Sequence, residues 1–268
     1  MSMGSSDHIE QQSRTRMIKL YAIESVSPSD RMDGRSESNR LKEYITSVIN
    51  ARGTTHFQHD FADVLDKTQF NERMAKIELD ISGEMENNDV LPFLHISCHG
   101  TTDHLKLTNG EIFWDDLTKL IRPLTVRCTG NLVLCISACS GISASSVGGN
   151  PEFPLKCLII GPKGRPTWDQ CYDGFSLLYE SIISSESVPD RIDRNEAEKL
   201  VLGMNRKLNQ DDLFQHIYLD EHTEKIIAIL KQNDIEPATT VGLTRSFAKL
   251  VAGGQIVPKQ IKRMPELE

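Results

Sequence analysis

Short apolar runs alternate with amphipathic segments along most of the chain, and this alternation limits its fold more than any other feature. The clearest runs are MIKLYAI (17–23), LPFLHISC (91–98), NLVLCIS (131–137) and LKCLII (155–160). Runs of this kind are typical of strands buried on both faces of a parallel sheet. The pattern predicts an α/β fold, a three-layer α/β/α sandwich with a mostly parallel sheet of about six strands.

The other elements are assigned from hydrophobic periodicity and from turn and capping residues. Asn109-Gly110 between two short alternating runs predicts a β-hairpin. Ser38 and Asp115 are expected to cap the helices that follow them. Further strands are expected at 54–61 and 213–219, and helices at 39–51, 68–82, 115–121, 142–147, 171–183, 194–208 and 223–232.

Composition and charge exclude several classes of protein. The 268 residues include 38 acidic and 30 basic side chains, and the resulting net charge of −8 argues against a dedicated nucleic-acid binder. No apolar run approaches the ~18 residues that a membrane span needs. The first residues are polar and lack the apolar segment that a secretion signal contains. We expect a disordered leader at 1–15, one domain at 16–268, a cytoplasmic location and no membrane partner.

The six cysteines form no Cys-x-x-Cys pair, which together with the missing export signal predicts reduced thiols. A free cysteine is usually a small buried apolar residue. Cys98, Cys135 and Cys157 lie inside apolar runs and fit that description. Cys139 differs, because it comes directly after such a run and is followed by Ser140-Gly141.

His99 and Cys139 each stand at the end of an apolar run, where open α/β sheets place their functional sites. A thiol is mostly protonated at neutral pH, so a nucleophilic cysteine needs a base or a lowered pKa. We expect His99 to be that base and a helix at 142–147 to favour the thiolate. Gly100 and the small residues after Cys139 are expected to admit a substrate backbone, with backbone amides as an oxyanion hole.

A metal site is the alternative interpretation of the histidines and cysteines near position 99. His95 and His99 lie about 13 Å apart on an extended strand, and Cys98 points to the other face. Zinc ligands lie about 2.0–2.3 Å from the ion, so this spacing does not favour a metal site. We predict no metal and interpret His95 as a core histidine or one that supports the site.

Two motifs resemble those of a known family. FLHISCHG (93–100) and LVLCISACSG (132–141) resemble the strand–His-Gly and strand–Ala-Cys-x-Gly motifs of the caspase-like cysteine peptidases. The insert at 105–117 and the segments at 157–183 and 195–208 resemble the CHAT branch of that family, whose domains are often attached to TPR repeats. The resemblance covers residues 90 to 220, about half of the chain.

The resemblance implies a cysteine endopeptidase that needs no cofactor. His99 and Cys139 would be catalytic, and the backbone amides of Gly100 and Cys139 would form the oxyanion hole. The substrate would be another protein. A regulatory partner or signal would switch the enzyme on, in a setting such as bacterial antiviral defence or programmed cell death.

The resemblance also suggests substrate-binding residues, although the chain departs from the family here. Ser137 stands where relatives specific for basic residues have an aspartate, so that preference does not carry over. Asp169 and Asp173 are candidates for a substitute acid, and Trp168 for the wall of the groove. Two other functions remain open: a catalytically silent binding module, and a thiol-dependent hydrolase of small molecules.

Overall fold

The computed structural model describes residues 16–87, 90–148, 157–185, 187–189 and 191–219. The leader expected at 1–15 and the helix expected at 223–232 lie outside these residues. The elements are β1 (Met17–Ser25), α1 (Pro28–Met32), α2 (Glu37–Arg52), β2 (Phe57–Asp63), α3 (Lys67–Asn87), β3 (Val90–Gly100), β4 (His104–Leu107), β5 (Gly110–Phe113), α4 (Trp114–Arg127), β6 (Leu132–Ser137), the 3₁₀ helix η1 (Gly141–Gly148), β7 (Cys157–Pro162), α5 (Trp168–Ile183), α6 (Arg194–Lys207) and β8 (Phe214–Leu219).

The strands form one eight-stranded sheet, and the predicted α/β class is confirmed. Six strands follow one another in the order β2-β1-β3-β6-β7-β8, and the hairpin of β4 and β5 joins the carboxyl end of β3. The first five strands of this order are parallel, and β8 runs antiparallel to β7. The carboxyl ends of β1, β3 and β6 therefore lie beside one another at one edge of the molecule.

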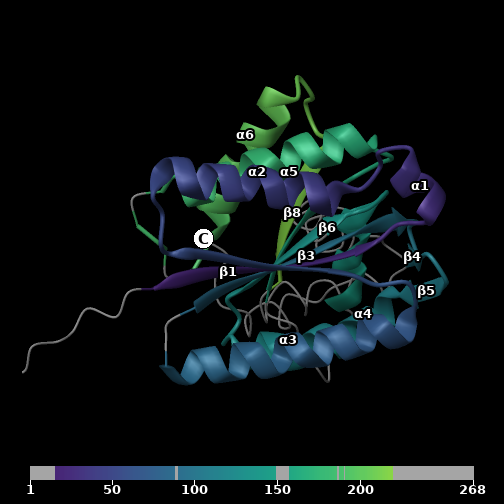
Figure 1. The fold of residues 1–268 in the computed structure, drawn as a ribbon, viewed down its shortest axis with the longest axis horizontal. Helices are drawn as coiled ribbons and strands as arrows, with labels where there is room; N and C mark the ends of the chain where they lie inside the picture. Colours follow the sequence, from purple (N-terminus) through teal and green to yellow (C-terminus); the bar gives the residue numbers. More distant parts are fainter. Residues whose placement is uncertain (1–15, 88–89, 149–156, 186, 190, 220–268) are drawn as a thin grey trace, which may run out of the picture.

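Helices cover both faces of the sheet, as Figure 1 shows. α2, α5 and α6 lie on one face, where Leu41, Phe175 and Val201 pack against strand residues such as Phe93. α3 and α4 lie on the other face, where Phe70 and others pack against strand residues such as Ile96 and Ile136. The result is the expected three-layer sandwich with two separate apolar cores.

Local signals place several helix ends. Gly53 ends α2 in the left-handed region at φ 64°, which a residue without a Cβ adopts at little cost. Thr167 and Gln170 form a reciprocal capping box at the start of α5. The expected cap at Ser38 is wrong by two residues, because α2 already begins at Glu37 and Ser36 is the capping position.

α4 differs most from its prediction. Asp115 lies in the first turn and does not cap the helix, which begins at Trp114 after Phe113. The helix continues through Pro123 to Arg127, well beyond the expected end at Ile121. Proline removes one backbone hydrogen bond, but Leu124 beyond it stays buried in the same core as Leu117 and Ile121. This burial favours the longer helix.

No helix among the described residues is long and apolar enough to cross a membrane.

Candidate functional site

The register of two parallel strands brings His99 and Cys139 to neighbouring positions. β3 and β6 pair with Ser97 opposite Ser137; His99 lies two positions further along β3, and Cys139 lies two positions after Ser137, the last residue of β6. Because side chains alternate between the faces of a strand, His99 lies on the face of β3 that carries Ser97. His99 and Cys139 line one small pocket of about 40 Å³ together with Trp168 and Ser137. The structure thus brings together the two residues that the sequence singled out.

Cys139 differs from the other cysteines in its exposure. Among the six, all of which the structure describes, it alone is partly exposed and the rest are buried. Burial raises the pKa of Cys135 to about 12 and also raises the pKa of Cys98 and Cys171, which lie on the pocket wall. A neutral thiol is a poor nucleophile, so these buried cysteines are inert beside Cys139.

The turn after Cys139 is held by backbone hydrogen bonds. Ser140 adopts a left-handed conformation at φ 55° and donates its N–H to Gly164 at 2.6 Å. Gly141 donates to Ala138 at 2.9 Å. These two amides are therefore occupied, whereas the Cys139 amide makes no hydrogen bond to another described residue. The Cys139 amide is the donor of this turn that remains for a ligand.

Gly100 is required by the neighbouring turn, not by open space for a substrate as the sequence suggested. A Cβ at this position would lie 2.6 Å from the carbonyl oxygen of Cys139 and 2.9 Å from the Cβ of Ala138. Real Cβ atoms do not approach backbone oxygens so closely, so a larger residue would push the two strand ends apart. Gly100 sets how closely the His99 and Cys139 segments approach each other.

The expected α-helix after Cys139 is a 3₁₀ helix, η1. It begins two residues after the cysteine. In its first turn Ser143 donates to Ser140 at 2.8 Å, so this amide does not point freely at the thiol. The Ser143 amide of this helix N-terminus is therefore not free to interact with Cys139.

His99 has a carboxylate partner that sequence reasoning missed. Its Nε2 lies 3.2 Å from Oδ2 of Asp30, which α1 places beside the carboxyl end of β3. Hydrogen bonds from Ser27 and then from His99 lower the pKa of Asp30 to about 2. The rings of His99 and Trp168 pack edge to face, with centroids 5.4 Å apart and an angle of 78° between their planes. The sequence signal for Asp30 was only its place in the first turn of a short helix capped by Ser27.

A second carboxylate, Glu37, lies buried behind the floor of the pocket. Its Oε2 accepts hydrogen bonds from the hydroxyls of Ser97, at 2.7 Å, and Ser137. Its Oε1 lies 3.5 Å from Nε2 of His95, and neither of these two atoms makes a hydrogen bond with another described residue. Nδ1 of His95 lies 2.8 Å from the hydroxyl of Tyr179 on α5. A polar network therefore runs from the pocket floor into the core.

The residues predicted to bind substrate fall into two groups. Ser137 and Trp168 line the pocket beside Cys139. Asp169 and Asp173 are exposed and do not line it. Asp169 makes an ion pair with Arg40 on α2, at 2.7 Å. The acidic side chain nearest to the Ser137 hydroxyl is Glu37.

The described residues contain no group of three or more histidine, cysteine or acidic side chains that could hold a metal ion. On β3, Cys98 packs into the core under α3 and α4, whereas His95 contacts Tyr179 on the opposite face. This separation follows from the pleat of the strand, as expected from the sequence.

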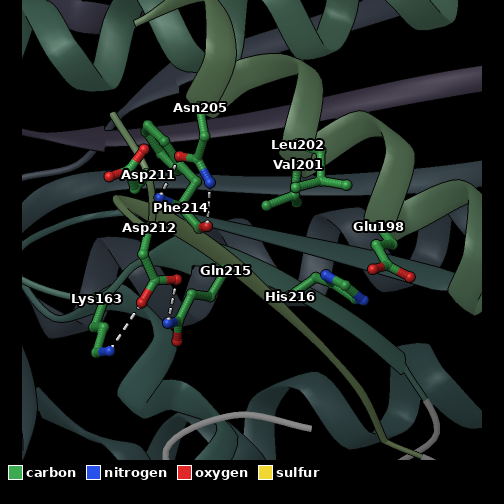
Figure 2. A pocket seen from close by; sticks show the side chains of 10 residues that line it. All are labelled: Lys163, Glu198, Val201, Leu202, Asn205, Asp211, Asp212, Phe214, Gln215 and His216. Carbon is green, nitrogen blue, oxygen red and sulfur yellow. Dashed lines mark hydrogen bonds and ion pairs between the residues drawn. The ribbon is translucent and has the colours of Figure 1, made fainter. Parts of the chain in front are cut away.

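A second pocket, of about 380 Å³, lies between α6 and β8 (Figure 2). Some of its polar groups are paired with other residues of the lining. The Asn205 side chain bonds both backbone groups of Phe214, and Lys163 pairs with Asp212 at 2.9 Å. None of the residues assigned from the sequence lines this pocket.

No protein-family model and no curated protein matches this sequence.

Proposed function

We propose that this protein is a cysteine endopeptidase of the caspase-like type, of the CHAT branch, acting through Cys139 and His99. The observation that carries the proposal is the pairing of a partly exposed cysteine with a histidine at adjacent parallel strand ends, where both line one pocket. The motif resemblance supports the same assignment. A nucleophile beside a base that is itself held by a third group is the general arrangement for covalent catalysis by a thiol.

The chemistry needs only groups of this chain and water. His99 accepts the Cys139 proton, and the Cys139 sulfur attacks the peptide carbonyl to form a tetrahedral intermediate. The Cys139 amide, together with that of Gly100, donates to the oxyanion. His99 then protonates the leaving amine, and a thioester remains. Water, deprotonated by His99, hydrolyses the thioester and restores the free thiol.

The substrate and the setting follow from the same proposal. A protein substrate would bind as an extended strand beside Cys139, with one side chain directed at the pocket. The enzyme would work in a reducing cytoplasm, because its nucleophile must stay unpaired. A partner protein or signal would control it, in a role such as defence or cell death, since an unregulated endopeptidase damages its host.

Cleavage of a diverse peptide library, read by mass spectrometry, tests the proposal. Wild type is expected to cut at defined positions, while Cys139→Ala and His99→Ala do not cut. His216→Ala is a matched control, because this histidine lines the separate pocket between α6 and β8. Cutting that survives the first two substitutions would refute the site. No cutting by wild type, and no labelling of Cys139 by a thiol-reactive peptide, would point instead to a binding module.

A further inference from the structure

Asp30 lies on a segment that the motif resemblance does not reach, and it contacts His99 directly. The two residues are 69 positions apart, and the contact joins Asp30 Oδ2 to His99 Nε2 at 3.2 Å. The His99 side chain is 45% exposed whereas that of Asp30 is 13% exposed. The carboxylate is thus the more firmly enclosed partner and is suited to fix the ring.

Both carboxylate oxygens of Asp30 are held in place. Oδ2 accepts a hydrogen bond from the Ser27 hydroxyl at 2.6 Å, and Oδ1 accepts one from Arg35 at 3.0 Å. The Asp30 amide in turn donates to the Ser27 oxygen at 3.1 Å. This anchoring limits the positions that the carboxylate can occupy. The direction of its bond to His99 is therefore set by the loop between β1 and α2.

A carboxylate at Nε2 determines which nitrogen of the imidazole is the base. An ionised carboxylate only accepts hydrogen bonds, so it favours the ring form that carries its proton on Nε2. Nδ1 then keeps its lone pair and is the nitrogen available to the Cys139 thiol. The same carboxylate stabilises the imidazolium that forms when His99 takes the proton.

We infer that Asp30 is a positioning residue, the third member of a Cys139–His99–Asp30 arrangement that orients the His99 base. This inference rests on the proposed function. Asp30 touches neither the reacting sulfur nor the pocket, so it acts only through His99. Replacing Asp30 is expected to lower kcat less than replacing a buried triad aspartate does. The reason is that Asp30 is partly exposed and also pairs with Arg35.

Steady-state kinetics on a peptide that wild type cuts, with Asp30→Ala and Asp30→Asn, test the inference. Both variants are expected to lower kcat about 10- to 100-fold, against about 10⁴-fold for a buried triad aspartate. KM should stay within about threefold, since Asp30 does not line the pocket. Asp33→Ala is the matched control, because Asp33 is an exposed acid of the same loop that also lies near Arg35, at 3.7 Å.

A spectroscopic readout separates orientation from folding and from activity. ¹⁵N spectra of labelled histidine should show His99 protonated on Nε2 in wild type and in Asp33→Ala, and as a mixture of the two ring forms in Asp30→Ala. Unchanged kcat and an unchanged ring form in Asp30→Ala would overturn the inference. If wild type cuts no peptide, the proposed function fails, and the spectra still decide whether Asp30 orients His99.

Discussion

The two faces of β3 and β6 differ in chemistry although the same two strands form both faces. Toward α3 and α4, β3, β6 and the residue after β6 present apolar side chains and one buried thiol: Leu94, Ile96, Cys98, Leu132, Leu134, Ile136 and Ala138. Toward α2 and α5, residues His95, Ser97 and Ser137 lie beneath the pocket that holds His99 and Cys139. One face is built for stability and the other carries the candidate site.

Several buried polar groups of this face find hydrogen-bond partners on helices that come from elsewhere in the chain. Glu37, at the start of α2, accepts from both serines, and Tyr179 of α5 bonds His95. Buried polar groups cost stability unless they are hydrogen-bonded. The candidate site therefore depends on residues of α2 and α5 as well as on the strands that carry its motifs.

The largest difference between the faces should be in reactivity. Cys139→Ala is expected to lower kcat/KM for peptide cleavage by at least about 10⁴-fold, because the nucleophile is lost. Cys128→Ala, which changes a buried thiol of the same apolar core outside the pocket, is expected to keep activity within about threefold. Iodoacetamide should modify Cys139 first in the native protein. Equal loss of activity in both variants would show that Cys139 is not the nucleophile.

The apolar face should dominate stability. Ile136→Ala removes a fully buried side chain and is expected to lower the free energy of unfolding by about 2–5 kcal/mol. Thermal unfolding followed by circular dichroism measures this as a lower Tm. Leu79→Ala is the control, because Leu79 is 75% exposed and its loss should change stability by no more than about 0.5 kcal/mol. A similar Tm for the two variants would contradict the assignment of this core.

Glu37 should show that the polar face also contributes to stability. Glu37→Ala leaves the hydroxyls of Ser97 and Ser137 buried without an acceptor and is expected to cost about 1–3 kcal/mol. Glu37→Gln retains an oxygen for these hydroxyls, and its amide nitrogen can donate to Nε2 of His95, so its cost should be smaller. Urea unfolding of the two variants tests this order. Equal destabilisation would show that charge, and not hydrogen bonding, governs the site.

The smallest expected effect is an acid dependence from Asp30. Its pKa is lowered from 3.8 to about 2, first by the Ser27 hydroxyl and then by His99. Because the pKa of Asp30 is lower in the folded protein, its ionised carboxylate stabilises the fold at pH values above about 4. This stabilisation is lost as the pH falls from about 4 to about 2. Tm values of wild type and Asp30→Asn should therefore differ at pH 6 and converge near pH 2. Parallel curves over that range would exclude this contribution.

The strands agree with their predicted bounds more closely than the helix α4 does. The strands at β1, β3, β6 and β8 and the hairpin turn at Asn109-Gly110 were predicted within three residues at each end, because alternation and turn chemistry are local. α4 was predicted too short, because tertiary burial outweighed the local signal of Pro123. The pairing of His99 with Cys139 followed from strand order, since parallel strands end at the same edge of the sheet.

The sequence alone did not identify the side chains that hydrogen-bond to the residues of the candidate site. Asp30 lies 69 positions from His99, Glu37 60 positions from Ser97, and Tyr179 84 positions from His95. No spacing rule connects residues so far apart. Asp169 and Asp173 were chosen by resemblance, yet the structure places them outside the pocket and places Glu37 behind Ser137.

By itself, the sequence determined the layers of the molecule and the two strand ends that carry a thiol and an imidazole, because hydrophobic periodicity and strand order follow from neighbouring residues. Only the tertiary structure decided which acids support those groups and which glycine lets their segments approach each other closely. Hydrogen-bond partners must meet within about 3 Å. That condition is set by how the helices pack on the sheet, not by the order of residues along the chain.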